Sequence, residues 1–202
     1  MPATSTRARP SRSEGRRQQI LRCAAQLFAS RGFHGVSVDD LGAAAGVTGP
    51  ALYRHFRSKD DILSELLVST SEHLLEGGRR CVEGAQDPRR ALDALIEFHV
   101  AFALDEPNVI TVHQRELSSL PPRARRTVRA LQHEYVLVWA DVVERVTSCG
   151  TERAIAAAHA GFGLMNSTPH SARLPGDAMP ALLREMAAAA LHAAASRSAP
   201  AR

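Results

Sequence analysis

Hydrophobic residues recur every three or four positions along most of this chain, which is the spacing of amphipathic α-helices. Segments that contain glycine or proline interrupt the pattern and mark helix ends. The sequence contains no alternation that would predict a strand and no internal repeat. It therefore predicts an all-α protein of about nine helices. The expected helices cover residues 14–30, 38–45, 48–56, 59–80, 88–106, 107–120, 122–148, 151–167 and 179–195, with a loop over 169–176.

Residues 37–59 are predicted to form two short helices joined by a tight turn. Ser37 can cap the first helix, with Asp40 three residues later as its partner in a capping box. Gly46 accepts the left-handed conformation that a sharp turn needs, so the first helix should end there. Thr48 is expected to cap the second helix. These signals together are typical of a helix-turn-helix DNA reader.

The second helix of this pair should expose several side chains that donate hydrogen bonds. Leu52 and Phe56 are expected to face the core, which leaves Tyr53, Arg54 and His55 on the outer face. A helical hairpin that only packs is the alternative. The joint exposure of the three side chains favours DNA binding, because a packing hairpin has no need of it.

Residues 14–66 resemble the N-terminal domain of the tetracycline-repressor (TetR) family of bacterial regulators. The matching pieces are ILRCAAQLFASRGF, VDDLGAAAGV, TGPALYRHF and SKDDIL. The resemblance implies a three-helix helix-turn-helix domain over residues 14–60 that binds a double-stranded DNA operator. It implies phosphate contacts from Ser37, Tyr53, His55 and Lys59, and base or groove contacts from Thr48, Gly49 and Arg54. Gly49 and Pro50 depart from the family pattern because they offer no side-chain donor, so base reading should depend on Arg54, Thr48 and backbone groups.

Basic residues are concentrated in the N-terminal part of the chain. Residues 1–60 hold ten basic and four acidic residues, whereas the remainder holds fifteen and seventeen. This asymmetry suits a polyanionic partner at one end of the molecule. Residues 1–13 are expected to be a disordered basic arm, which either reaches DNA or remains a solvated tail. The only lysine, Lys59, begins the fourth helix, where Ser58 and Asp61 predict a second capping box.

Residues 61–202 carry no nucleic-acid signature, and the TetR resemblance implies an effector-binding and dimerisation domain there. The last two predicted helices combine small and apolar residues, so two copies could approach closely in a four-helix interface. Ordinary packing within one chain is the alternative. We favour the interface because a two-fold reader needs it to match two half-sites. The expectation is a homodimer on a palindromic operator.

An effector pocket in this domain should be built from aromatic side chains and a few polar groups. The candidates are Phe98, Phe102, His113, Glu116, Tyr135, Trp139, Phe162 and Asn166, together with Val109 and Met165. Each of them could instead be a core residue. The body is rich in alanine, leucine and valine, which suits an elongated apolar ligand. Residues 106–139, together with NSTPHSAR at residues 166–173, also resemble a TetR subgroup associated with lipid and acyl-coenzyme A metabolism. This resemblance implies a fatty acid or an acyl-coenzyme A as effector.

The sequence favours no enzymatic activity, and we assign no catalytic residue, metal site or cofactor. His133 and Glu134 begin a string like the zinc motif HExxH, but Leu137 occupies the second histidine position. Neither a GxSxG nor a Walker phosphate-binding motif is present.

The three cysteines lie far apart, without the spacing of a metal site or of a disulfide framework. Neither a membrane-spanning run nor a signal peptide is apparent, so we expect a cytoplasmic protein with no membrane partner. The leading hypothesis is a ligand-responsive repressor. An activator, or a DNA-binding protein without an effector, is the alternative.

Overall fold

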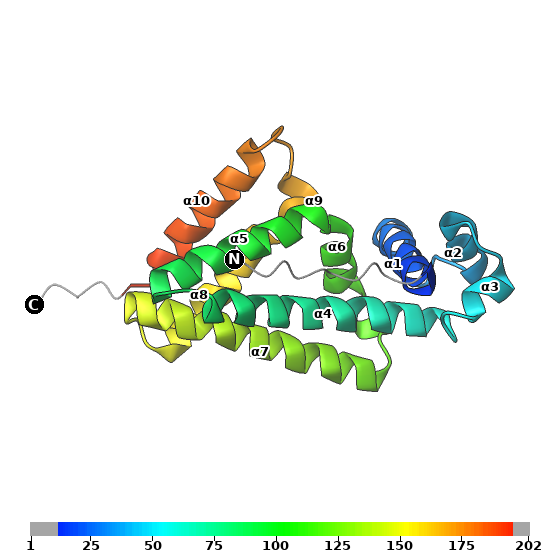
Figure 1. Cartoon of the computed structure of the whole chain (residues 1–202), viewed down its shortest axis with the longest axis horizontal. Coiled ribbons are helices and arrows are strands. Elements are labelled where there is room, and N and C mark those ends of the chain that lie inside the picture. Colours follow the sequence, from blue (N-terminus) through cyan, green and yellow to red (C-terminus); the bar gives the residue numbers. More distant parts are fainter. Residues whose placement is uncertain (1–11, 196–202) are drawn as a thin grey trace, which may run out of the picture.

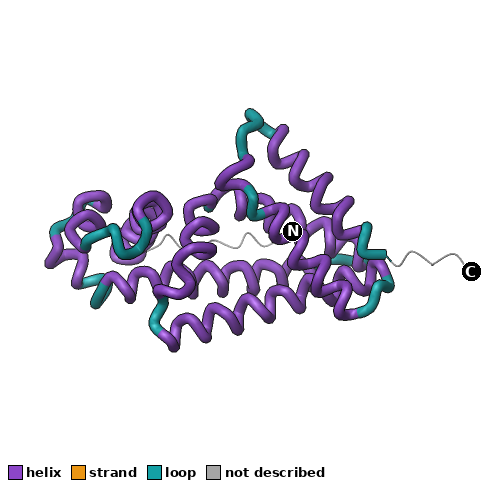
Figure 2. Tube along the Cα trace, turned by 180° about the vertical axis from the view of Figure 1, so that it is seen from behind, coloured by secondary structure: helices purple, strands orange, loops and turns teal. Residues whose placement is uncertain are grey.

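The computed structural model describes residues 12–195, which form ten α-helices and one short 3-10 helix, with no strand in this range (Figures 1 and 2). The all-α prediction is confirmed. Residues 1–11 of the predicted arm lie outside the described part of the chain. The elements are α1 (Arg12–Arg31), α2 (Val38–Ala45), α3 (Gly49–Tyr53), α4 (Lys59–Glu83), α5 (Pro88–Asp105), α6 (Pro107–Glu116), η1 (Leu117–Ser119), α7 (Pro122–Thr147), α8 (Thr151–Met165), α9 (Thr168–Ser171) and α10 (Ala178–His192).

Helices α1 to α3 form a head at one end of the molecule (Figure 1). Ile20 and Phe28 of α1 pack with Leu41 of α2 and with Leu52 of α3, and all four side chains are fully buried. The turn between α2 and α3 is made at Gly46, whose φ of 64° is left-handed, as predicted. The apolar spacing of the sequence thus places three short helices around one core.

The core of the head continues into the body of the protein. Helix α4 begins at the head and runs far into the body (Figure 1). Ile62 of α4, Val112 of α6 and Val128 of α7 are completely buried in the same cluster as the residues of α1 to α3. The predicted domain boundary at residue 60 is therefore not a break in packing, and a shift of α6 or α7 would be felt in the head.

The body is a layered bundle in which α4, α5, α7, α8 and α10 surround a second core. Two adjacent glycines let the neighbours of α4 approach closely. A Cβ on Gly77 would lie 2.0 Å from the ring of Phe98, and one on Gly78 would lie 2.6 Å from the ring of Tyr135. These glycines lower the helix propensity of α4 but admit the aromatic rings of α5 and α7 against its backbone.

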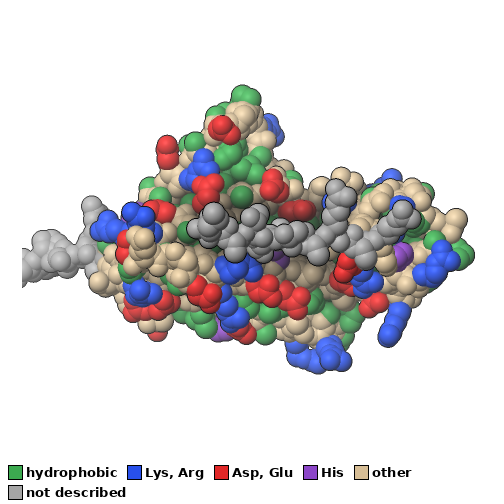
Figure 3. Space-filling view, in the orientation of Figure 1, with side chains coloured by type: hydrophobic (Ala, Val, Ile, Leu, Met, Phe, Trp, Pro, Cys, Tyr) green, Lys and Arg blue, Asp and Glu red, His purple; other side chains and the backbone are tan. Residues whose placement is uncertain are grey.

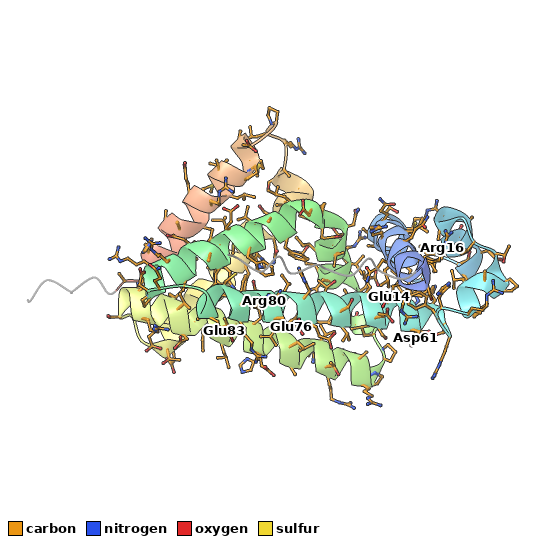
Figure 4. The ribbon with its side chains drawn as sticks, in the orientation of Figure 1. Glu14, Arg16, Asp61, Glu76, Arg80 and Glu83 are labelled. Carbon is orange, nitrogen blue, oxygen red and sulfur yellow. The ribbon has the colours of Figure 1, made fainter. Side chains whose placement is uncertain are left out.

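Charged side chains line the outer face of α4. Glu76 and Arg80 lie one turn apart (Figure 4), with 3.8 Å between their charged groups. Arg79 bonds Glu134 of α7 at 2.6 Å. Both pairs are about half exposed or more, so each should add little to stability.

Some helix ends differ from the prediction. Helix α7 ends at Thr147, one residue before the predicted end, and its C-cap Ser148 takes the left-handed conformation with φ of 54°. Gly150 then precedes α8. The expected loop over 169–176 contains most of the short helix α9. The local pattern could not predict α9, because a bond at its first residue is made to a distant helix. The Thr168 hydroxyl donates to the carbonyl of Ala103 in α5 at 2.6 Å.

The predicted capping box at the start of α4 is only half formed. Ser58 accepts a hydrogen bond from the N–H of Asp61, as expected. The carboxylate of Asp61 accepts from the N–H of Arg57 instead of that of Ser58, at 3.2 Å. No helix in residues 12–195 has the length and hydrophobicity needed to cross a bilayer.

Candidate DNA interface and effector cavity

The start of α2 is held by a complete capping box. Ser37 Oγ accepts from the N–H of Asp40 at 3.1 Å, and Asp40 Oδ2 accepts from the N–H of Ser37 at 2.8 Å. The hydrogen bonds from Ser37 also keep the pKa of Asp40 below its usual value. The Ser37 hydroxyl is already engaged in this cap. A phosphate contact from Ser37 would therefore have to use the same hydroxyl.

The predicted recognition helix is shorter than expected. Helix α3 ends at Tyr53, so Arg54 and His55 lie in the following turn. Thr48 occupies the cap position with its backbone, but its side chain makes no capping bond, contrary to the prediction. Thr48, Tyr53 and Arg54 are exposed, whereas Gly49 and His55 are half-buried. The exposed hydroxyl and guanidinium groups remain free to meet a ligand.

An arginine that sequence reasoning missed fixes the end of α3. Arg17 of α1 donates to the backbone carbonyl of His55 and forms a two-bond ion pair with Glu65 of α4. Its guanidinium also lies 4.2 Å from the centre of the Phe56 ring. The ion pair with Glu65 raises the pKa of Arg17. This one side chain joins three helices of the DNA-reading unit.

Lys59 is partly occupied by protein contacts. Its ammonium donates to the carbonyls of Phe33 at 2.8 Å and Val36 at 2.7 Å, and lies 4.5 Å from the Phe33 ring centre. An ammonium has three donors, so one remains for another acceptor. The residue predicted only as a phosphate contact therefore also holds the loop between α1 and α2.

Glu116, predicted as a ligand contact, does not line the cavity of the body that is described below. It is buried between body and head, where Oε1 accepts from the N–H of Phe33 at 3.1 Å. Ser119 donates to the other oxygen at 3.0 Å. Arg115 adds a bond to the carbonyl of Ala29 at 3.2 Å. The C-terminal end of α6 is thus tied to the head by hydrogen bonds.

Helices α4 to α8 line a half-open cavity of about 270 Å³ in the body. Five of the eight predicted ligand residues line it: Phe102, His113, Tyr135, Phe162 and Asn166. Val109 lines it as well, whereas Met165 is a buried core residue. Sequence reasoning missed Thr70, Leu74, His99, Ile110, Gln114, Gln132, Val136 and His159.

Phe98 and Trp139 were also predicted to line this cavity, and neither does. Trp139 is fully buried behind the lining, with its ring centre 5.1 Å from that of Phe162. Phe98 faces a separate groove of about 470 Å³ between α1 and the body. The groove shares Thr70, Phe102 and Val109 with the cavity, so the two spaces adjoin.

The cavity contains a buried polar chain centred on His99. Nδ1 of His99 lies 3.1 Å from the hydroxyl of Tyr135, and Nε2 lies 3.1 Å from Asn166 Oδ1. Burial lowers the pKa of His99 to about 4 and raises that of Tyr135. Both groups are therefore uncharged at neutral pH. His99 was missed because its position on α5 reads as an ordinary core site.

A second polar pair closes another side of the cavity. The amide nitrogen of Gln132 lies against Nε2 of His113, and burial lowers the pKa of His113. None of the described residues that line the cavity is Lys, Arg, Asp or Glu. The site is thus an apolar chamber with uncharged hydrogen-bonding groups.

No group of three His, Cys, Asp or Glu side chains within residues 12–195 could hold a metal ion. The three cysteines are free and half-buried, less buried than a core position would make them. On the face shown in Figure 3, Lys and Arg side chains occur at the outer end of the head and are also spread over the body. The two notable surfaces are therefore this end of the head and the chamber in the body.

Two family models match the chain. The model described as bacterial regulatory proteins, tetR family, matches residues 20–66, and the tetracyclin repressor-like C-terminal domain matches residues 85–173. The transcriptional repressor KstR2 of Rhodococcus jostii is 30% identical over 159 residues, which cover 78% of each chain. The chain belongs to the TetR family. Its relatives are transcriptional regulators, this chain is a TetR-family transcriptional regulator, and TetR-family regulators bind operator DNA.

Other TetR-family proteins are similar over different extents. The transcriptional activator FasR of Mycolicibacterium smegmatis is 35% identical over 82 residues, covering 41% of this chain and 37% of FasR. The crystal structure of AibR in complex with isovaleryl coenzyme A and operator DNA has a TM-score of 0.69 at 20% identity. That alignment covers 85% of this chain and 97% of AibR, and it shows a common fold.

Proposed function

We propose that this regulator is a repressor that binds a palindromic operator as a homodimer and is released by a small, largely apolar effector. The observation that carries the proposal is the position of α6. Val109, Ile110 and His113 of this helix line the cavity, and Glu116 at its end bonds the head. A ligand that displaces α6 would therefore act on the DNA-reading unit through a continuous core.

The DNA contacts are proposed for one end of the head. Arg54 and Thr48 would read bases, with Gly49 allowing close approach of the backbone. Ser37, Tyr53, His55 and the third donor of Lys59 would contact phosphates. The exposure of Thr48, Tyr53 and Arg54 supports this assignment.

The dimer is proposed to form through α8 and α10. Leu182 and Met186 of α10 are 39% and 47% exposed, although they lie on a mostly apolar helix. Ala156, Ala160 and Gly163 of α8 are also exposed. Small residues beside exposed large ones allow close helix packing between two copies, which would place two heads on one operator.

Selection of bound sequences from random double-stranded DNA tests the proposal. We expect enrichment of a palindrome with half-sites about one helical turn apart. Arg54→Ala should cost about 1–3 kcal/mol of operator affinity and relax the preference at one base position. Lys59→Met should weaken binding to all sequences and lower the salt-dependence slope by about 0.9.

Arg145→Ala, at an exposed position near the end of α7, is the matched control and should change neither affinity nor preference. Failure to enrich any sequence would refute operator reading. If the salt-dependence slope is unchanged in Lys59→Met, Lys59 does not contact a phosphate and only holds the loop between α1 and α2. Transcription from the selected operator, measured with and without the protein, distinguishes a repressor from an activator.

A further inference from the structure

We infer that the chamber around His99 selects a ligand with an uncharged hydrogen-bonding group, such as a carbonyl or hydroxyl, on a compact apolar body, and rejects carboxylates. The inference rests on the proposed effector role and adds the chemical class of ligand. A free ketone or alcohol and the acyl thioester of a larger molecule share this chemistry.

The hydrogen-bond directions within the chain determine what it offers to a ligand. Asn166 Oδ1 can only accept, so His99 Nε2 carries the proton. His99 Nδ1 is then an acceptor, and the Tyr135 hydroxyl donates to it. The Asn166 amide N–H groups make no other hydrogen bond among residues 12–195, and the Tyr135 oxygen keeps acceptor capacity. Asn166 thus offers a donor, and Tyr135 offers an acceptor.

Apart from three histidines, of which His159 is exposed, the described lining residues include no cation that could pair with a buried anion. His99 and His113 are uncharged at neutral pH because burial lowers their pKa values. A carboxylate in the chamber would lose its hydration without gaining a cation, whereas a carbonyl would lose little and gain the Asn166 donor. This disfavours a ligand whose carboxylate lies inside the chamber.

The size of the chamber limits the apolar body. Its volume of about 270 Å³ lies just below the range of drug-sized sites, which begins at about 300 Å³. A longer ligand would have to extend into the adjoining groove, which is lined by Arg22 and His73 as well as by Asp105 and Glu106. The part that fits the chamber is therefore small and compact.

Trp139 provides an intrinsic reporter of occupancy. It is the only tryptophan in the chain, and it contacts the rings of His99, Tyr135 and Phe162 from behind the lining. We would titrate the full chain at pH 7.5 with three probes of equal length, 2-nonanone, 1-nonanol and nonanoate, and follow Trp139 fluorescence. Octanoyl-coenzyme A, as a fourth probe, tests the thioester source.

Asn166→Asp is the decisive variant, because a carboxylate keeps the acceptor for His99 but removes the amide donors. Asn166→Leu provides a second, uncharged substitution. The matched control is Asn108→Asp, at the only other asparagine of the chain, which does not line the chamber. Thermal unfolding confirms that each variant is folded before binding is compared.

We expect the ketone and the alcohol to bind at least tenfold more tightly than nonanoate, and both Asn166 variants to weaken ketone binding several-fold, with Asn108→Asp unchanged. Tighter binding of octanoyl-coenzyme A than of 2-nonanone would identify a thioester as the source. Equal or tighter binding of nonanoate, or no fluorescence response to any neutral probe, would overturn the inference. Operator binding by the unliganded protein is measured separately, so loss of the proposed function would be recognised independently.

Discussion

The carboxylate of Glu116, at the end of α6, accepts a hydrogen bond from the backbone N–H of Phe33 in the loop between α1 and α2, at 3.1 Å. The same loop is held from its other side, because Lys59 donates to the Phe33 carbonyl at 2.8 Å. The backbone of Phe33 in the head is thus hydrogen-bonded both to α6, which lines the cavity, and to α4, which begins at the DNA-reading unit.

Glu116→Ala tests this connection. The substitution leaves the buried Phe33 N–H without its acceptor, so we expect the free energy of unfolding to fall by about 1–3 kcal/mol. Urea denaturation measures the loss. Glu116→Gln retains an acceptor oxygen and should recover part of it. Glu185→Ala, at an exposed position of α10, is the control and should leave the free energy of unfolding nearly unchanged. If it lowered the free energy of unfolding as much as Glu116→Ala does, the loss could not be attributed to the bond between Glu116 and Phe33.

His99 should make stability fall in mild acid. The pKa of His99 is lowered by burial from 6.5 to about 4, so between these values the unfolded chain binds more protons than the folded one. Its contribution is complete above pH 6.5 and is lost as the pH falls toward 4, amounting to about 3 kcal/mol. The free energy of unfolding, measured from pH 7.5 to 4, should therefore drop more steeply in wild type than in His99→Gln. His133→Gln, on the exposed surface of α7, should follow the wild-type curve; parallel curves for wild type and His99→Gln would contradict the prediction.

Gly78→Ala should disturb the position of Tyr135. The added Cβ would lie 2.6 Å from the Tyr135 ring, so the ring or α4 must move. We expect a loss of about 1–3 kcal/mol from overpacking, reduced by up to about 1 kcal/mol through the better helix propensity of alanine. The matched control is Gly15→Ala in α1, where a Cβ meets nothing within 4 Å, and it should be neutral or stabilising. If both variants melt at the same temperature, the close approach is not needed.

The combined change Leu182→Arg and Met186→Arg should produce monomers. Both side chains are exposed on α10, so the folded chain should tolerate them while a dimer interface does not. Sedimentation velocity would report the mass, and operator binding should weaken with it. Leu137→Arg, at a leucine of α7 that is 41% exposed, is the control and should remain dimeric. A dimer that persists in the double variant would locate the interface elsewhere.

Much of the head could be predicted from local sequence. Ser37 with Asp40, and Gly46 in the turn, act within a few residues of their partners, so short-range rules identify them. The same rules failed at Thr48, whose side chain makes no cap, and at α3, which ends before Arg54. Helix ends depend on neighbours such as Arg17, which holds the carbonyl of His55 from a distant part of the chain.

The chamber was predictable only in part. The aromatic residues on the helices of the body predicted a cavity, and three of them, Phe102, Tyr135 and Phe162, do line the chamber. Trp139 lies behind the lining, and Phe98 belongs to the adjoining groove, because the side that a buried helix turns toward a cavity depends on its packing angle.

By itself, the sequence determined the helical class, most of the helices and the helix-turn-helix unit, since these follow from periodicity, caps and turn residues within short stretches. The family followed from the resemblance of residues 14–66 to TetR regulators. The tertiary structure alone decided that Glu116 joins body to head, that Lys59 holds a loop and that His99 connects Tyr135 to Asn166. The physical reason is the separation of the partners. The two bonds of His99 span 36 and 67 residues, and that of Glu116 spans 83 residues. Such pairs come into contact only when the helices have packed, so they cannot be predicted from local patterns in the sequence.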